Sequence, residues 1–254
     1  MTDDGLVLWR LRVRYRKDGR LAFLGHLEVM NTIMRSVRRS GLPFSVGNGF
    51  ARRMRIQFSQ ALPVGASSQA EYFDLMLTRR VDPARALEAL RAATPAGLAP
   101  LGAAYLPRKV AALEAWATVS RWSCDLMGEG LDAGALEEAV HLMRGRGTLE
   151  YQRGEKTKRV DLTETLVSLA VERVAGGLHA DLVTRSTNEC SLRPAVLFDK
   201  AMGERPLSGA RLDYARVCRL GQWHAEEDGR LVEPLDMAAC ENEQGYSVSA
   251  HTEQ

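Results

Sequence analysis

The chain has 254 residues, of which 45% are hydrophobic and 26% charged, and its formal net charge is +2 at pH 7. This length suggests one large domain or two small ones, and the composition excludes a chain that is disordered throughout. A net charge near zero argues against a protein that is basic over its whole surface. The charge is unevenly spread, however, because residues 1–60 sum to +8 and the remaining residues to −6.

No pattern for secretion, membrane insertion or metal binding is found. The N-terminus lacks the apolar segment of a signal peptide, and no run reaches the about 18 apolar residues of a membrane helix. The cysteines form neither a CxxC pair nor the CxxxCxxC triplet of radical-SAM iron–sulfur clusters. They are Cys124, Cys190, Cys218 and Cys240. We expect a cytoplasmic protein with free thiols, no metal and no cofactor of its own.

The first half of the chain alternates between strand and helix patterns. Residues 9–16 alternate strictly between apolar and basic side chains, which is typical of a strand with one buried face. From Phe23 onward apolar residues recur at helical spacing until Gly41 and Pro43 end the helix. The next predicted elements are strands at 54–58 and 71–77, a helix from Asp82, and a strand near 101–106. This β-α-β-β-α-β order is that of the ferredoxin-like motif.

A similar order recurs in the second half. We predict a strand at 119–126, a helix at 133–144, a hairpin of 149–152 with 159–162, a strand at 178–184, a helix at 194–202 and a strand at 211–217. The expected fold is α+β, with two tandem ferredoxin-like (split βαβ) units. The expected domains are residues 1–115 and 116–224. Residues 225–254, with eight acids and one arginine, are expected to form a mobile acidic tail.

The basic residues of the N-terminal domain are candidates for binding nucleic acid. Arginines on alternate positions of the first strand would line one sheet face at steps of about 6.8 Å. A solvated face, or one paired with acids of the second half, explains the pattern equally well. Three more arginines follow a glycine-rich turn, with an aromatic residue placed to stack a base. The candidates are Arg10, Arg12, Arg14, Arg16, Phe50, Arg52, Arg53 and Arg55. A second, smaller basic cluster consists of Lys156, Lys158 and Arg159.

His26 is the candidate catalytic residue. It follows Gly25 at the start of the first predicted helix, where a histidine can act as a general base or contact phosphate. A histidine at the edge of the core, hydrogen-bonded to backbone, is the alternative interpretation. Walker A, GxGxxG and GxSxG motifs are all missing from the sequence.

Several motifs in one order resemble those of a known family. Residues 17–28 (KDGRLAFLGHLE) resemble its K-x-G-x-x-R-F-L-S-H-L-D pattern, and residues 38–43 (RRSGLP) its R-R-A-x-L-P. Further matches lie at residues 49–55, 62–72, 158–162 and 192–194. The chain thus resembles the bacterial radical-SAM-linked protein family, a domain of unknown function, over residues 8–220. It departs from the pattern at Gly25, where the family has Ser, and at Ala51 and Arg52, where it has Asn-Pro.

The resemblance implies an accessory protein that acts with a radical-SAM enzyme. Three hypotheses follow. The first is a non-catalytic module that binds or presents RNA, such as a tRNA or rRNA. The second is a metal-independent RNA-processing endonuclease that uses His26. The third is a protein-only adaptor, which would bind the radical-SAM protein but no RNA. No membrane association is expected.

Overall fold

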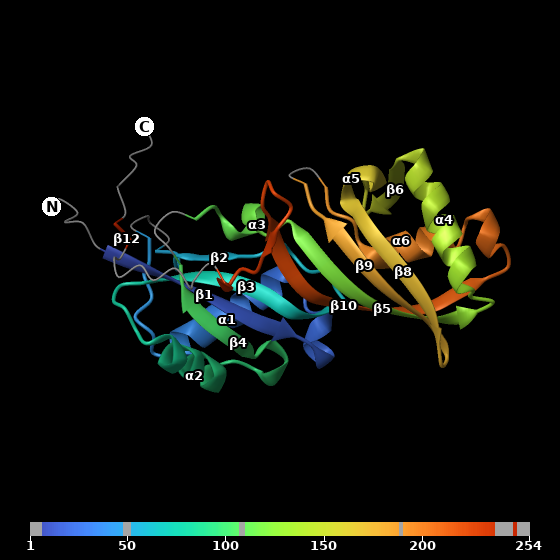
Figure 1. Cartoon of the computed structure of the whole chain (residues 1–254). Coiled ribbons are helices and arrows are strands. Elements are labelled where there is room, and N and C mark those ends of the chain that lie inside the picture. The colour runs from blue at the N-terminus through green and yellow to red at the C-terminus, as the bar shows by residue number, and fades with distance from the viewer. Residues whose placement is uncertain (1–6, 48–51, 107–109, 188–189, 237–245, 248–254) are drawn as a thin grey trace. The chain divides into compact units, whose positions relative to one another are not determined.

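The computed structural model describes residues 7–47, 52–106, 110–187, 190–236 and 246–247, which form two compact units (Figure 1). Unit 1 comprises Met1–Val64, Ala70–Ala117 and Trp223–Gln254, and unit 2 comprises Gly65–Gln69 and Thr118–Gln222. Helices and strands mix in both units, which confirms the predicted α+β class. The chain therefore begins in unit 1, builds unit 2, and returns to unit 1 with its last residues.

Unit 1 contains six principal elements in the order strand, helix, strand, strand, helix, strand. They are β1 (Val7–Lys17), α1 (His26–Arg39), β2 (Ile56–Phe58), β3 (Ser67–Leu77), α2 (Pro83–Ala93) and β4 (Pro100–Tyr105). Their strands lie in the order β4-β1-β3-β2. The shorter elements are η1 (Gly19–Phe23), η2 (Ala96–Leu98), α3 (Leu113–Trp116), β11 (Leu231–Val232) and β12 (Tyr246–Ser247). Strand β12 pairs with the beginning of β1.

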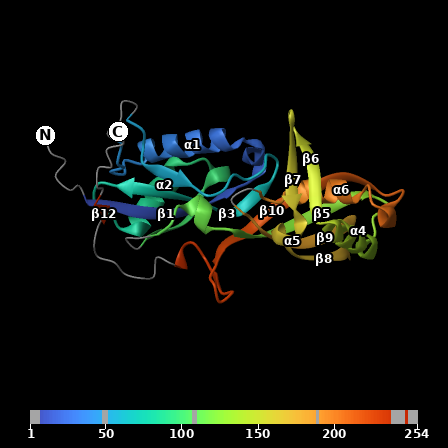
Figure 2. The ribbon, with the colours of Figure 1, turned by 90° about the horizontal axis from the view of Figure 1, so that it is seen from above.

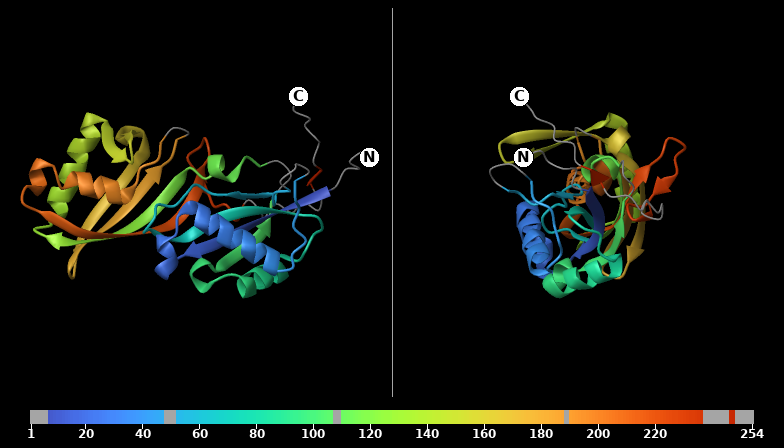
Figure 3. Two further views of the ribbon diagram at one scale, coloured as in Figure 1. Left: turned by 180° about the vertical axis from the view of Figure 1, so that it is seen from behind. Right: turned by 90° about the vertical axis from the view of Figure 1, so that its left-hand side faces the viewer.

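Helices α1 and α2 cover one face of this sheet (Figures 1 and 3). Each starts at a local signal: the backbone NH of Gly25 donates to the Glu28 carboxylate at 2.7 Å, and Asp82 accepts from the backbone NH of Arg85 at 3.0 Å. Their apolar residues pack against the odd-numbered residues of β1 and β3 in the main core. That core includes Leu11, Val13, Tyr15, Ile33, Val37, Phe73, Leu75, Leu77 and Leu90. The alternation of residues 9–16 is therefore that of a real strand.

The opposite face of the unit 1 sheet is also covered. Helix α3 lies on the side away from α1 and α2 (Figure 1), and Leu113 packs there with Ala70, Tyr72 and Leu235. Burial raises the pKa of Tyr72 above its ordinary value of 10.0. Residues 225–236, which begin the predicted tail, thus contribute β11 and part of this cover.

Unit 2 repeats the same succession with an insertion. Its principal elements are β5 (Val119–Glu129), α4 (Ala133–Arg146), β8 (Leu166–Val174), β9 (Gly177–Arg185), α6 (Pro194–Ala201) and β10 (Arg211–Ala225). The strands lie in the order β10-β5-β9-β8, and Cys218 and Arg219 of β10 also pair with Ser67 and Ser68 of β3. The inserted elements are β6 (Thr148–Arg153), β7 (Lys156–Asp161) and α5 (Leu162–Thr165). A short helix, η3 (Arg205–Leu207), precedes β10.

The second half differs from the sequence prediction in one important respect. The hairpin predicted at 149–162 exists, but β6 and β7 form a separate two-stranded sheet rather than part of the main one. The strand at that place in the main sheet is β8, which the sequence analysis missed. Residues 166–174 escape detection because most of them are exposed or half-buried and their apolar residues do not alternate cleanly.

Candidate nucleic-acid interface

The arginines of β1 do not form the outward ladder that their alternation suggested. Arg10 and Arg12 are buried, with 8% and 0% of their surface exposed, and Arg14 is half-buried. The Arg16 side chain is 41% exposed and lies 3.3 Å from the Asp18 carboxylate. The exposed-face interpretation is therefore wrong for Arg10 and Arg12, because α3 and the C-terminal residues cover that face. A direct role for these two in binding nucleic acid stays a prediction.

Both buried arginines converge on Asp74 of β3, which is 1% exposed. Arg12 binds it through two bonds, Nε to Oδ1 at 2.7 Å and Nη2 to Oδ2 at 2.9 Å, and Arg10 Nε donates to Oδ2 at 2.9 Å. Arg10 also donates to the Val110 carbonyl at 3.0 Å and to Gln57 Oε1 at 3.2 Å, and Arg12 Nη1 donates to the Pro234 carbonyl at 3.3 Å. Two cations that share one carboxylate and several carbonyls form a structural network.

A different group of arginines is exposed at one end of unit 1. It lies on the last two turns of α1, on the segment before β2, and just after β3. We define this basic end of unit 1 as Arg35, Arg38, Arg39, Arg52, Arg53, Arg55, Arg79 and Arg80. All eight are exposed except Arg55, which is half-buried.

Backbone hydrogen bonds hold the three segments of the basic end side by side. The amide of Ser45, just beyond α1, donates to the Met76 carbonyl at 2.7 Å, and the amide of Arg55 donates to the Ser45 carbonyl at 2.9 Å. The amide of Thr78, next to Arg79, donates to the Pro43 carbonyl at 2.8 Å. Arginines far apart in the sequence are thereby gathered at one place.

Two of the three segments of the basic end contain no acidic residue, and the third is followed by Asp82. No acidic residue occurs between Glu28 and Glu71 in the sequence. Among the residues that the structure describes, none of the eight arginines forms an ion pair with a carboxylate. Arg80 instead stacks on the rings of Trp9 and Tyr105, at 5.5 and 5.3 Å. Cations that have no acidic partner, next to aromatic rings, suit a polyanionic ligand.

Arg52 adds a conformational feature to the basic end. Its φ of +38° makes it the one described non-glycine residue with a positive φ. This backbone costs on the order of 1–3 kcal/mol for a residue with a side chain, and such residues cluster at ligand sites. Phe50, the predicted base-stacking residue, lies outside the described residues.

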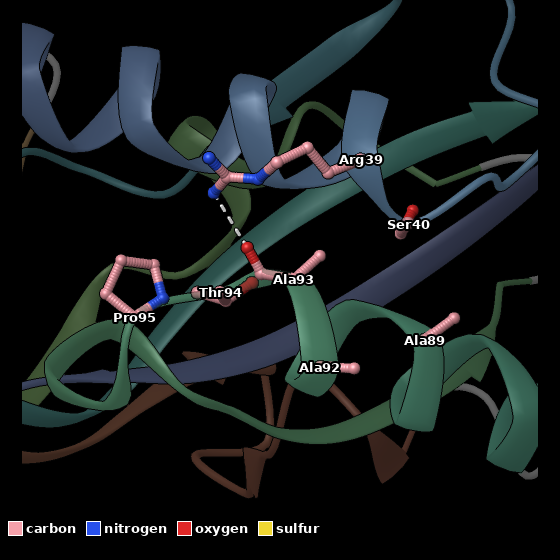
Figure 4. A pocket seen from close by; sticks show the side chains of 7 residues that line it. All are labelled: Arg39, Ser40, Ala89, Ala92, Ala93, Thr94 and Pro95. Carbon is pink, nitrogen blue, oxygen red and sulfur yellow. Dashed lines mark hydrogen bonds between the residues drawn. The ribbon is translucent and has the colours of Figure 1, made fainter.

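A shallow pocket of about 570 Å³ lies beside the basic end, between α1 and α2 (Figure 4). Arg39 spans it and donates from Nη2 to the Ala93 carbonyl at 2.8 Å. The lining consists of Arg39, Ser40, Ala89, Ala92, Ala93, Thr94 and Pro95. Because the lining side chains are small and Arg39 alone is charged, the pocket offers only one cation to a ligand.

His26 begins α1 and is half-buried. Its ring lies edge-on to Phe58, with centroids 6.2 Å apart. The described residues provide no carboxylate hydrogen-bonded to this ring, so the paired arrangement of an activated base is not assembled there. The catalytic role of His26 stays a prediction.

A histidine–carboxylate pair that the sequence analysis missed lies on the sheet of unit 2. His179 Nδ1 is 2.8 Å from Asp125 Oδ1, and Arg216 Nη1 is 3.9 Å from the other oxygen of Asp125. The pair forms because Asp125 of β5 stands opposite His179 of β9 in the register. The alternation of both strands predicts a shared face, but only the register brings these two residues together.

Neither a metal centre nor a membrane-spanning helix is found in the described part of the chain. It contains no group of three or more His, Cys, Asp or Glu side chains that could hold a metal ion. None of its helices combines the length and apolarity needed to span a membrane.

Two solved structures show a distant likeness to this chain. A crystal structure of a Cbf5–Nop10–Gar1 complex matches with TM-score 0.45 and 9% identity, over 85% of this chain and 50% of the other. An unknown protein from Galdieria sulphuraria matches with TM-score 0.25 and 11% identity, over 84% of this chain and 98% of the other. This chain spans only half the length of the matched chain in the Cbf5–Nop10–Gar1 complex. TM-scores this low support no functional inference.

No curated protein matches the chain in sequence. A family model described as "Uncharacterized protein conserved in bacteria (DUF2344)" matches residues 10–194. The match begins within β1, includes α1 and the basic end, and continues to the first residue of α6. Because it includes well over half of the 254 residues, the chain belongs to the DUF2344 family of bacterial proteins.

Proposed function

We propose that this protein is a non-catalytic RNA-binding module that presents a tRNA or rRNA to a radical-SAM enzyme. The radical-SAM partner is suggested by the resemblance of the sequence motifs at residues 17–28 and 38–43. RNA as the ligand is suggested by the distribution of charge in unit 1. In this proposal the partner carries out the chemistry.

The two units are, in this proposal, tandem ferredoxin-like units. The strand orders β4-β1-β3-β2 and β10-β5-β9-β8 support this, because each places the fourth strand beside the first and the third beside the second. In both units one helix follows the first strand and another precedes the fourth. Unit 2 then differs from unit 1 by the insertion of β6, β7 and α5.

The observation that carries the RNA proposal is the basic end of unit 1. Eight arginines from three segments are gathered there, without an acidic partner among the described residues. Guanidinium groups bind phosphates through paired hydrogen bonds, and neutralisation of phosphates releases counterions. The buried pair Arg10 and Arg12 is not needed for this surface.

The proposal is tested by the salt dependence of binding to a fluorescently labelled mixture of tRNAs. The variant R38Q/R53Q removes two charges from the basic end, and R121Q/R216Q removes two exposed charges from unit 2 as a matched control. If both arginines contact single-stranded phosphates, the slope of log affinity against log salt falls by about 1.4 in R38Q/R53Q. The control keeps the slope of the unaltered protein.

The same proteins, together with H26A, separate the two alternative functions. Cleavage of RNA by the unaltered protein, lost in H26A, would establish the endonuclease. A flat salt response with a stable radical-SAM complex would establish the adaptor. Equal losses of affinity in R38Q/R53Q and R121Q/R216Q would mean that the basic end has no special role.

A further inference from the structure

The hairpin inserted into unit 2 has two faces of different character. Its register pairs Glu150 with Arg159, Tyr151 with Lys158, and Arg153 with Lys156. Because directly opposed residues of an antiparallel pair project to the same side, and successive pairs project to opposite sides, each face can be read from this register. Figure 2 shows the hairpin extending away from the sheet of unit 2.

On one face of the hairpin, polar side chains of β6 are bonded to polar side chains of β7. Arg159 Nε lies 2.7 Å from Glu150 Oε1, and Gln152 Nε2 donates to Thr157 Oγ1 at 2.9 Å. Both pairs cross from β6 to β7. This face therefore offers little uncompensated charge to a ligand.

The other face begins apolar and becomes basic. At its root, where β6 and β7 contact α5, the opposed residues Leu149 and Val160 are 5% and 2% exposed. Farther out come half-buried Tyr151 with exposed Lys158, and then exposed Arg153 with Lys156. None of these three cations forms an ion pair with a described carboxylate. Glu155 stands in the turn at the tip and belongs to neither face.

We propose that this second face, defined as Tyr151, Arg153, Lys156 and Lys158, is an RNA-binding arm that holds a single strand. The inference rests on the proposed function for its ligand class, but it assigns a separate surface on the other unit. Tyr151 supplies a ring for an unpaired base, and the three cations contact phosphates. Successive rows on one face are about 6.8 Å apart, a step that suits neighbouring phosphates of an extended strand.

A single-stranded ligand suits this face better than a duplex. A cationic row beside an aromatic ring is the usual arrangement for single strands, whose bases are free to stack. The deep, narrow major groove of an RNA duplex would not admit such side chains. Lys156 and Lys158 are also point charges on flexible stems, which follow a backbone without requiring one geometry.

Two neighbouring residues provide a matched test, because Lys158 and Arg159 lie on opposite faces of the same strand. We would measure binding of the full chain to a labelled single-stranded RNA of about 20 nucleotides, long enough for one site. Lys158→Gln is expected to lower the salt slope by about 0.7, whereas Arg159→Gln leaves it unchanged. Glu155→Gln is expected to raise the affinity slightly.

Stacking is tested separately from charge. Tyr151→Leu is expected to weaken RNA binding on the order of tenfold with no change in salt slope, and to leave heparin binding unchanged. Heparin is polyanionic but has no bases. Equal effects of Lys158→Gln and Arg159→Gln on the salt slope would overturn the proposal of an RNA-binding arm. An unchanged affinity of Tyr151→Leu for RNA would show that the face attracts any polyanion, which would also overturn it.

RNA binding by the unaltered protein and its variants distinguishes a failure of the arm from a failure of the proposed function. If the unaltered protein binds RNA and depends on Arg38 and Arg53 but not on Lys158, only the arm is wrong. If the unaltered protein binds no RNA at low salt, both proposals fail. Circular dichroism of each variant verifies that the exposed substitutions leave the fold intact.

Discussion

Arg12 and Asp74 form a two-bond ion pair in the interior of unit 1, at 2.7 and 2.9 Å, with 0% and 1% of their surfaces exposed. Asp74 also accepts from Arg10, so one carboxylate compensates two buried guanidinium groups. The ring of Trp116, 5.5 Å from the Arg12 guanidinium, and the Pro234 carbonyl complete its surroundings. Two of the charges of β1 are thus compensated inside the unit by a single carboxylate.

Asp74→Asn is expected to destabilise the protein strongly. The substitution leaves two buried cations without a counter-charge, which costs about 3–5 kcal/mol when a buried pair is broken. Urea unfolding followed by circular dichroism measures the loss. The control is Asp18→Asn, which breaks the exposed pair with Arg16 and is expected to cost less than about 1 kcal/mol. Similar costs for the two variants would contradict the assignment of a buried network.

Gly128 and Gly145 are expected to respond oppositely to alanine. A Cβ on Gly128 would lie 1.9 Å from the Arg211 carbonyl oxygen, so the two strands would have to move apart. Overpacking of this kind costs about 1–3 kcal/mol or more. A Cβ on Gly145 meets nothing within 4 Å, and the residue lies inside α4. Gly145→Ala is therefore expected to stabilise by about 0.5–1 kcal/mol. Thermal unfolding of both variants measures whether Gly128→Ala lowers the melting temperature and Gly145→Ala raises it.

Cys124 is expected to resist alkylation in the folded protein. It is 0% exposed, and burial raises the pKa of its thiol from 9.0 to about 12. The thiolate is the reactive form, so iodoacetamide at pH 8 should modify half-exposed Cys190 and Cys218 first. Peptide mass spectrometry follows each site. Labelling of Cys124 as fast as Cys190 in the folded protein would contradict its burial.

The same raised pKa has a consequence for stability. Well below pH 9.0 the thiol is protonated in both the folded and the unfolded chain, so its contribution does not change with pH. As the pH rises from 9.0 toward about 12, the unfolded chain ionises first, and the free energy of unfolding falls. Urea midpoints measured across this interval should decline, and less steeply in Cys124→Ala.

Residues 231–236 are expected to stabilise unit 1. We compare a chain ending at residue 236 with one ending at residue 230, so that both lack β12. The shorter chain loses the Pro234 carbonyl that accepts from Arg12, and the contact of Leu235 with Tyr72. A hydrogen bond to a buried charge is worth about 1.5–3 kcal/mol. The urea midpoint of the chain that ends at residue 230 should therefore be clearly lower. Equal midpoints would show that this segment only rests on the surface.

Local patterns predicted much of the fold. The alternation of residues 9–16 and the Asp82–Pro83 start signal correspond to β1 and α2. The first helix begins later than its apolar periodicity suggested. Gly25 is the N-cap, and Phe23 lies before it in η1 with 65% of its surface exposed. A periodic pattern alone does not locate the residue at which a helix starts.

The burial of the β1 arginines could not be predicted from their own segment. An alternating apolar and basic strand looks the same whether its basic face meets water or is covered. The difference arises from Asp74, 62 residues away from Arg12, and from Pro234, 222 residues away. The same holds for the His179–Asp125 pair, which depends on the register of β5 and β9. Exposed arginines that follow turns, such as Arg53, were easier to recognise.

The separation of Arg12 from Pro234 also affects how the protein folds during synthesis. Unit 1 takes residues from both ends of the chain, whereas unit 2 is complete at Gln222. The ribosome releases the chain from its N-terminus onward, so unit 2 can fold while the cover over Arg12 has yet to emerge. Until then Arg12 lacks one of its acceptors, and the long loop that joins the two segments slows closure. Residues 231–236 can therefore dock onto β1 only after the whole of unit 2 has been synthesised.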